Sequence, residues 1–166
     1  INNPLAIRAI LNSAIISGGT LVLTLLLAAP AAYALARRRL RFTVLVVLLL
    51  LISQMVPTII IAGPLFVIFS QVGLIDSYAA LILANTTTVT LPFAIIILRP
   101  FFLSVPGDVE DAALIDGCSR FGAFFRVVLP LVKPGLITVG AIAFLLAWGE
   151  FVYGLTLITS EEMQPA

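Results

Sequence analysis

The stretch VEDAALIDGCSRFGAFFRVVLPLVKPGL, residues 109–136, is rich in charged residues, although the chain as a whole has few of them. The charged residues in it and directly before it, acidic first and basic last, are Asp108, Glu110, Asp111, Asp116, Arg120, Arg126 and Lys133. The sequence on both sides is apolar enough to lie in lipid. We therefore expect this segment to be a polar connection between membrane-embedded parts of the chain.

The composition of the 166-residue chain favours a membrane protein. Hydrophobic residues make up 61% and charged residues 10%, against roughly 45–50% and 25% in soluble domains, and the mean hydropathy is +1.22. A net charge of +1 argues against nucleic acid as a partner. Cys118 is the only cysteine and histidine is absent. We therefore expect no disulfide, no metal site and no catalytic chemistry in this chain.

Long uncharged apolar runs predict four membrane-spanning helices, because a span needs about 20 mostly apolar residues. Their expected ranges are about 12–36, 42–70, 77–98 and 134–158, and the polar segment occupies about 99–133. Continuous runs of this length are not the alternating segments of a membrane β-barrel. The expected fold class is all-α, a polytopic membrane helical bundle that forms one domain over residues 1–166.

Prolines fall inside two of these runs. Pro57 and the pair Gly63-Pro64 lie in the second run, where they predict either a broken helix beside a substrate site or a kink without function. Pro92 predicts a bend or a break in the third run.

The basic residues predict which side of the membrane each connection faces. Four arginines fall within residues 37–41, between the first two expected spans, and four more basic residues fall within 99–133. The opposite face holds only Arg8. Because basic residues concentrate on the cytoplasmic side, both connections are expected there.

Within the polar segment, helix-start and helix-stop residues predict two short helices. Pro106 suits the first turn of one helix. The acidic residues that follow it then lie near the positive end of the helix dipole. Gly117 suits the end of this helix, where a residue often takes the left-handed conformation. The small side chains of Ala112 and Ala113 would let a partner approach closely. Ser119 is expected to cap the second helix. The apolar stripe of that second helix is expected to consist of Phe121, Phe124, Phe125 and Val128.

The spacing in this segment resembles a signature of the permease subunits of bacterial ABC importers. That signature is Glu-Ala-Ala, three residues, Gly, nine residues, Ile, one residue and Leu-Pro. The matching positions here are Asp111, Ala112, Ala113, Gly117, Val127, Leu129 and Pro130. Asp replaces Glu, which shortens the acid by one methylene, and Val replaces Ile. LNSAIIS (11–17) and AYALARRRLRF (32–42) resemble the ends of a family transmembrane helix, and AWGEFVYGLTLIT (147–159) resembles the carbohydrate branch.

This resemblance implies the membrane subunit of a type I importer that moves a sugar by alternating access. The subunit would be a multi-pass protein of the bacterial cytoplasmic (inner) membrane. This chain starts without methionine or a signal peptide and stops without an evident structural end, so it would be an internal portion that lacks the first and last spans. The implied partners are a cytoplasmic ATPase dimer, a second homologous permease and an extracytoplasmic solute-binding protein. ATP and Mg²⁺ would bind the ATPase, because this chain has no phosphate-binding loop.

The resemblance also implies that the short helix around residues 108–116 is a coupling helix, seated in a cleft of the ATPase. The residues implied in this coupling are Glu110, Asp111, Ala112, Ala113, Asp116, Gly117, Leu129 and Pro130.

Polar and aromatic residues inside the expected spans are candidates for a substrate pathway: Gln54, Asn85, Trp148, Glu150 and Tyr153. Each also has a structural explanation. The two amides, like the threonines at 86–88, suit hydrogen bonds between helices. The two aromatic residues suit an interface belt as well as stacking on a sugar ring. Glu150 would cost about 2.5–3.5 kcal/mol at mid-membrane and less near the outer interface.

Other functions remain open from the sequence. The same machine could carry glycerol phosphate, a polyamine or an amino acid, although none of the four expected spans holds Lys or Arg, which favours a neutral solute. A non-transporting membrane scaffold would not need the spacing of the polar segment. The absence of histidine and of facing acids in the spans argues against an intramembrane enzyme.

Overall fold

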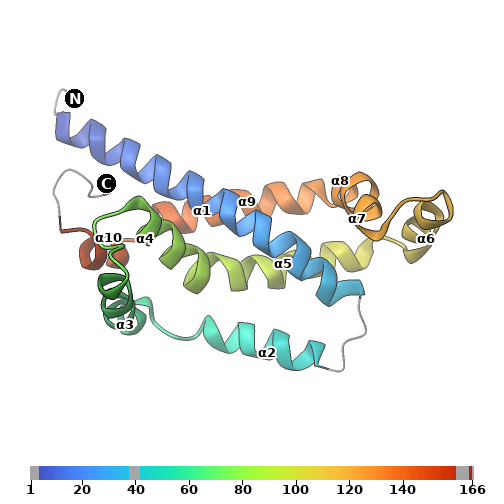
Figure 1. The fold of residues 1–166 in the computed structure, drawn as a ribbon, viewed down its shortest axis with the longest axis horizontal. Coiled ribbons are helices and arrows are strands. Elements are labelled where there is room, and N and C mark those ends of the chain that lie inside the picture. The colour runs from blue at the N-terminus through green and yellow to red at the C-terminus, as the bar shows by residue number, and fades with distance from the viewer. Residues whose placement is uncertain (1–3, 38–41, 160–164, 166) are drawn as a thin grey trace.

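The computed structural model describes residues 4–37, 42–159 and 165, which are almost entirely helical (Figure 1). No strand occurs in this described part of the chain. The elements in chain order are α1 (Pro4–Arg37), α2 (Thr43–Ser53), α3 (Thr58–Gln71), α4 (Tyr78–Ala84), the π-helical turn η1 (Asn85–Thr90), α5 (Leu91–Ser104), α6 (Gly107–Ile115), α7 (Arg120–Ala123), the π-helical turn η2 (Phe124–Val128), α8 (Leu129–Leu131), α9 (Lys133–Trp148) and α10 (Val152–Leu157). The predicted all-α fold is confirmed.

α1 is the central helix of the bundle and packs along α5 and α9 (Figure 1). α4, η1 and α5 follow one another without a gap and run in the same direction as α1. At one end the Tyr78 hydroxyl donates to Asn12 Oδ1 at 2.8 Å, and at the other Arg99 Nε donates to the Leu35 carbonyl at 3.3 Å. Since these partners are separated by nearly the same number of residues, the two helices keep a constant register along their length.

Two of the described helices are long and apolar enough to cross a membrane, Ala6–Arg37 and Tyr78–Ser104. Two bent pairs raise the number to four if each pair is one span. α2 and α3 meet at 95°, and Arg120–Leu131 meets α9 at 76°.

The break expected in the second apolar run lies between α2 and α3. Pro57 directly precedes α3 with an extended backbone, so it starts a new helix and cannot continue the previous one. Pro64, in contrast, lies inside α3 without ending it. None of the described residues of α2 is buried in this chain, and α2 packs only on α5 among the principal helix contacts.

Each π-helical turn directly precedes a Leu-Pro pair. Leu91-Pro92 follows η1 and Leu129-Pro130 follows η2. Each proline takes one of the first two positions of the next helix, where a missing N–H disturbs least. Of the bend or break predicted at Pro92, a break is absent, and the helix continues past the expected end at residue 98 to Ser104. Arg99, expected in the polar connection, belongs to α5.

The fourth apolar run does not form one helix over 134–158. α9 ends at Trp148, and α10 is a separate short helix. The Glu150 carboxylate accepts hydrogen bonds from the backbone N–H groups of Val152 at 3.0 Å and Tyr153 at 2.8 Å. Because these are the unpaired donors at the start of a helix, Glu150 initiates α10 as a capping residue.

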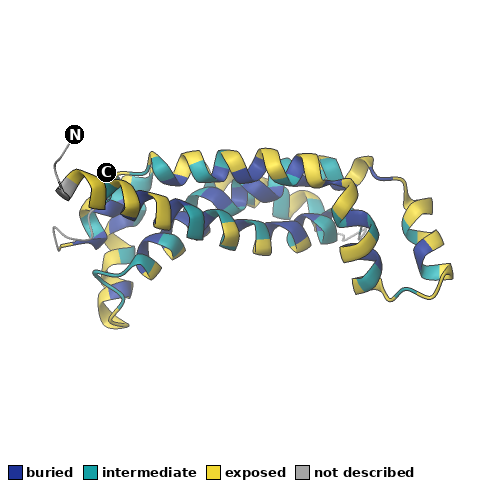
Figure 2. Ribbon diagram, turned by 90° about the horizontal axis from the view of Figure 1, so that it is seen from above, coloured by how far each residue is buried: buried dark blue, intermediate teal, exposed yellow. Residues whose placement is uncertain are grey.

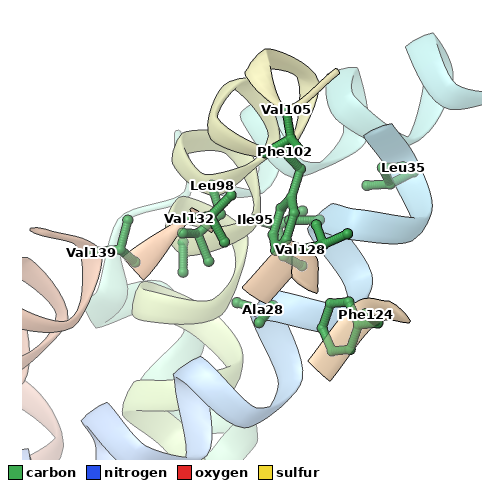
Figure 3. Packing of buried hydrophobic residues seen from close by; sticks show 13 residues of the cluster. Ala28, Leu35, Ile95, Leu98, Phe102, Val105, Phe124, Val128, Val132 and Val139 are labelled. Atoms are coloured by element: carbon green, nitrogen blue, oxygen red, sulfur yellow. The ribbon is translucent and has the colours of Figure 1, made fainter. Parts of the chain in front are cut away.

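Buried apolar side chains form two clusters, one toward each end of the bundle. The cluster near α6 contains Phe102 and Val128, both fully buried (Figure 3). Tyr33 adds another aromatic ring to this cluster. The centroid of its ring lies 5.7 Å from that of Phe102 and 4.8 Å from that of Phe124. The cluster at the other end contains Tyr153 and joins α3 and α4 to α10. Figure 2 shows the buried positions facing inward along the length of the bundle.

Glycines let helices approach closely at two crossings. A Cβ atom on Gly135 would lie 2.6 Å from Phe101 Cγ, so α9 meets α5 with no room for a side chain at this point. A Cβ atom on Gly19 would lie 2.5 Å from Ile82 Cδ1, at the crossing of α1 and α4. Small residues at interfaces are typical of helices that pack in lipid.

Candidate functional site

α6 projects beyond the bundle at the end where α1 and α5 finish (Figures 1 and 2). The basic residues Arg37 and Arg99 lie at this end. Arg38, Arg39 and Arg41, on which the predicted orientation also rests, are outside the described residues.

The end of α6 is fixed by its own backbone. Gly117 has a φ of +86°, the left-handed conformation predicted for it. The Gly117 N–H donates to the Leu114 carbonyl at 3.1 Å, and the Cys118 N–H donates to the Ala113 carbonyl at 3.0 Å. These two bonds form a Schellman motif, which satisfies carbonyls that a helix end leaves unpaired.

The next helix begins as predicted. The Ser119 Oγ accepts a hydrogen bond from the Gly122 N–H at 3.1 Å, so Ser119 caps α7. The expected apolar stripe is divided, however. Phe124 and Val128 are buried, whereas Phe121 is 79% and Phe125 59% exposed. The π-helical turn η2 changes the angular step between successive residues, so the 3.6-residue period no longer applies there.

α6 and the turn after it present a mixed acidic and apolar outer surface. Asp111, Ala112 and Asp116 are exposed, and Ile115 is 85% exposed. Ala113 is buried beneath them. A hollow of about 500 Å³ lies beside this surface, lined in part by Asp116, Gly117, Ser119, Phe121 and Arg126.

Glu110 faces α1 and not this outer surface. Its Oε2 lies 3.0 Å from Arg37 Nε, and its Oε1 accepts a hydrogen bond from the Tyr33 hydroxyl. Arg37 Nη2 also donates to the Val105 carbonyl at 2.9 Å. The side chains of Arg37 and Glu110 are only 19% and 15% exposed, so this ion pair is largely shielded from solvent.

The last two residues of the signature lie behind α6. Leu129 is half-buried in the wall of a groove of about 930 Å³ between α1 and the α6–α9 segment, and Pro130 is exposed on α8. The structure therefore separates the signature into an outward part on α6 and a supporting part on α8.

Four of the five candidate pathway residues gather around η1. Asn85 is the first residue of η1 and is buried. Gln54 Nε2 donates to the Val89 carbonyl at 3.2 Å, and the Tyr153 hydroxyl lies 2.7 Å from Thr88 Oγ1. Glu150 is joined to this group through its bond to the Tyr153 N–H.

The remaining candidate, Trp148, makes no hydrogen bond to this group among the described residues. It packs on Phe144, with ring centroids 5.6 Å apart. The polar group around η1 is therefore the part of the predicted pathway that the structure brings together.

A buried polar row on α1, which the sequence reading missed, faces the same region. Its residues are Asn12, Ser13, Ser17, Thr20 and Thr24. Thr24 Oγ1 lies 2.5 Å from Thr90 Oγ1 of η1. The spacing of positions 13, 17, 20 and 24, which repeats every three or four residues, was the available signal that they share one helix face.

No group of three or more potential metal ligands among His, Cys, Asp and Glu occurs in the part of the chain that the structure describes.

Residues 24–164 match the family described as "Binding-protein-dependent transport system inner membrane component", and the chain belongs to this family. It is a family of transport permeases and not of enzymes, and membership agrees with the membrane-crossing helices described above.

Two relatives illustrate the match. The sulfoquinovosyl glycerol transport system permease protein SmoH of Agrobacterium fabrum is 42% identical over 145 residues, which cover 87% of this chain and 50% of the relative. The trehalose transport system permease protein SugB of Mycobacterium tuberculosis is 38% identical over 153 residues, which cover 92% of this chain and 56% of the relative. The chain thus spans about half the length of the curated relatives it matches.

The fold matches a solved structure as well. A crystal structure of a bacterial ABC transporter involved in the import of the acidic polysaccharide alginate aligns with a TM-score of 0.83 and 23% identity. The alignment covers 99% of this chain and 57% of the other. The helical arrangement is therefore that of an ABC importer permease.

Proposed function

We propose that the chain is part of the translocating subunit of an ATP-driven sugar importer, a multi-pass protein of the bacterial cytoplasmic membrane. Its partners would be a cytoplasmic ATPase dimer that binds ATP and Mg²⁺, a second homologous permease and an extracytoplasmic binding protein. The subunit would alternate between inward-open and outward-open states as the ATPase subunits close and separate.

Sugar as the transported class is supported by the relatives. Both relatives described above carry a sugar in their names, and a third, the diacetylchitobiose permease NgcG of Streptomyces coelicolor, is 37% identical over 152 residues. The region around η1 also suits a neutral, hydroxyl-rich solute, because the exposed Gln54 offers an amide there and residues 42–98 contain no Lys or Arg.

The observation that carries the coupling role is the outward face of α6. Asp111 and Ala112 lie exposed on a short helix at the end of the bundle, and the Schellman motif at Gly117 fixes where that helix stops. Ile115 and Phe121 are exposed apolar side chains of a size that fills a pocket on a partner, and Phe121 lines the hollow beside Gly117. A surface of this kind suits docking into a cleft.

A cross-linking experiment tests this role in the full-length subunit, assembled with its second permease and ATPase. Ala112→Cys in a Cys118→Ser background should form a disulfide with cysteines placed around the ATPase cleft. The matched control is Val72→Cys, which is 61% exposed and lies just after α3, toward the other end of the bundle. Cross-linking from position 72 and not from position 112 would contradict the proposal.

Transport is tested with the same assembly in liposomes. ATP hydrolysis should be stimulated by the binding protein loaded with a neutral di- or trisaccharide, and labelled sugar should accumulate inside. If binding protein loaded with an amino acid or a polyamine stimulated ATP hydrolysis, and no sugar did, the result would contradict sugar as the substrate class.

A further inference from the structure

We propose that Glu110 is a positioning residue that ties α6 to α1 inside the subunit, so that movement of α6 displaces the central helix. This inference rests on the proposed coupling function and deepens it. It assigns Glu110 to a contact within the permease and not to the ATPase surface.

The contact consists of two hydrogen bonds and one ion pair to the last turn of α1. Tyr33 and Arg37 stand four residues apart and so share one face of the helix. The Tyr33 hydroxyl donates to one oxygen of Glu110, and Arg37 Nε lies 3.0 Å from the other. Arg37 also holds the Val105 carbonyl, directly before α6, at 2.9 Å. We call these residues the Glu110 clasp: Tyr33, Arg37, Val105 and Glu110.

α1 is not adjacent to α6 in the chain, whereas its neighbours α5 and α9 connect to α6 through short segments. Residue 105 continues directly from α5, and the chain after α6 leads through α7, η2 and α8 into α9. α1 ends 73 positions before Glu110, so its direct contact with α6 consists of side-chain interactions. The packing of α6 itself is with α7 and η2.

The other acids of α6 and of the turn after it do not share this role. Among the described residues, no hydrogen bond or ion pair links the side chains of Asp108, Asp111 or Asp116 to α1. Asp111 and Asp116 are exposed, whereas the side chain of Glu110 is 15% exposed. One acid of this segment therefore faces inward, and the others face solvent.

α1 is suited to carry a displacement from the clasp into the membrane. It is one continuous helix that packs along both α5 and α9. Thr24, which contacts Thr90 of η1, lies 13 positions before Arg37, or about 20 Å along the axis at 1.5 Å per residue. A shift imposed at the clasp therefore reaches the polar group around η1 through one helix, which Pro30 does not end.

The test uses the full-length subunit in the reconstituted complex, with uptake per ATP hydrolysed and cross-linking from Ala112→Cys as the two measurements. Glu110→Gln should lower sugar uptake per ATP by about tenfold, the lower end of what is implied by removing the charge that pairs with Arg37 and accepts the Tyr33 hydrogen bond. The yield of the cross-link from position 112 should stay the same, because docking does not use Glu110. The matched control is Asp108→Asn, an exposed acid of the same helix, which should change neither measurement.

Exchange of the two charges separates a positioning role from a general loss of folding. Arg37→Glu and Glu110→Arg should each impair uptake, and the double variant should recover part of it, because the exchange restores the ion pair but not the bond to the Val105 carbonyl. Normal uptake per ATP in Glu110→Gln, or loss of the cross-link in that variant, would overturn the clasp. Absence of the cross-link in the otherwise unchanged subunit would instead count against the coupling function on which the clasp rests.

Discussion

Replacement of Gly135 by alanine is expected to separate two helices that depend on direct contact. The added Cβ would lie 2.6 Å from Phe101 Cγ and 2.8 Å from both Cδ atoms of the same ring. Ordinary contact begins at 3.4 Å. The clash is with the base of an aromatic ring and not with the end of a flexible chain, so the ring or one of the helices has to move.

The expected magnitude follows from two opposing effects. Overpacking of a well-filled site costs about 1–3 kcal/mol. Alanine in a helix interior is favoured over glycine by about 1 kcal/mol. Gly18→Ala is the matched control, because a Cβ at Gly18 in α1 meets nothing within 4 Å. Gly18 lies in the interior of α1 and gains this preference in full, whereas Gly135 lies in the first turn of α9 and gains less. Gly135→Ala should therefore be less stable than Gly18→Ala by at least about 1 kcal/mol.

Reversible unfolding of the full-length subunit in mixed detergent micelles measures this difference. A second substitution, Phe101→Leu, should restore part of the stability lost in Gly135→Ala, because it removes the ring that the new methyl group meets. Equal stability of the two glycine variants would refute the close crossing of α5 and α9. The same conclusion would follow if Phe101→Leu lowered the stability of Gly135→Ala further and restored none of it.

Two further predictions concern the end of the bundle opposite α6. Glu150→Ala removes both acceptors at the start of α10 and should destabilise the subunit by about 0.5–2 kcal/mol. Glu150→Gln keeps one acceptor and should lose less stability. Equal stability of the two variants and the unchanged subunit in detergent unfolding would contradict the capping role. Tyr153→Phe removes one bond of about 0.6 kcal/mol, and Thr88→Val removes that same bond together with the one to the Ala84 carbonyl, so the two losses should not add in the double variant. Full additivity would show that the two hydroxyls do not interact.

The polar segment was largely predictable from the sequence because its decisive residues act locally. Gly117 adopts a conformation that costs other residues free energy, and Ser119 caps a helix from its own position. The long apolar runs were equally informative, since a span is recognised by length and composition.

The features that the sequence did not predict depend on contacts between distant segments. The direction of Glu110 is set by Tyr33 and Arg37, more than 70 positions away. The end of α9 at Trp148 depends on Glu150 being used as a cap, a role for which short side chains are the usual signal. The continuity of the helix through Pro92 depends on η1, which has no residue pattern of its own.

The two π-helical turns let the chain hold an extra residue at η1 and at η2 without turning the helix that follows. Each α-helical residue rotates the chain by about 100° and advances it by about 1.5 Å. A π-helical turn closes its backbone bonds over five residues and not four, so it carries one more residue in about the same rotation. Deleting one residue from η1 and restoring the regular ladder should therefore leave Arg99 and Phe102 facing α1. The same deletion in the regular part of α5 before these residues would turn them by about 100°. One-residue differences in length between homologous chains should therefore fall at these two turns.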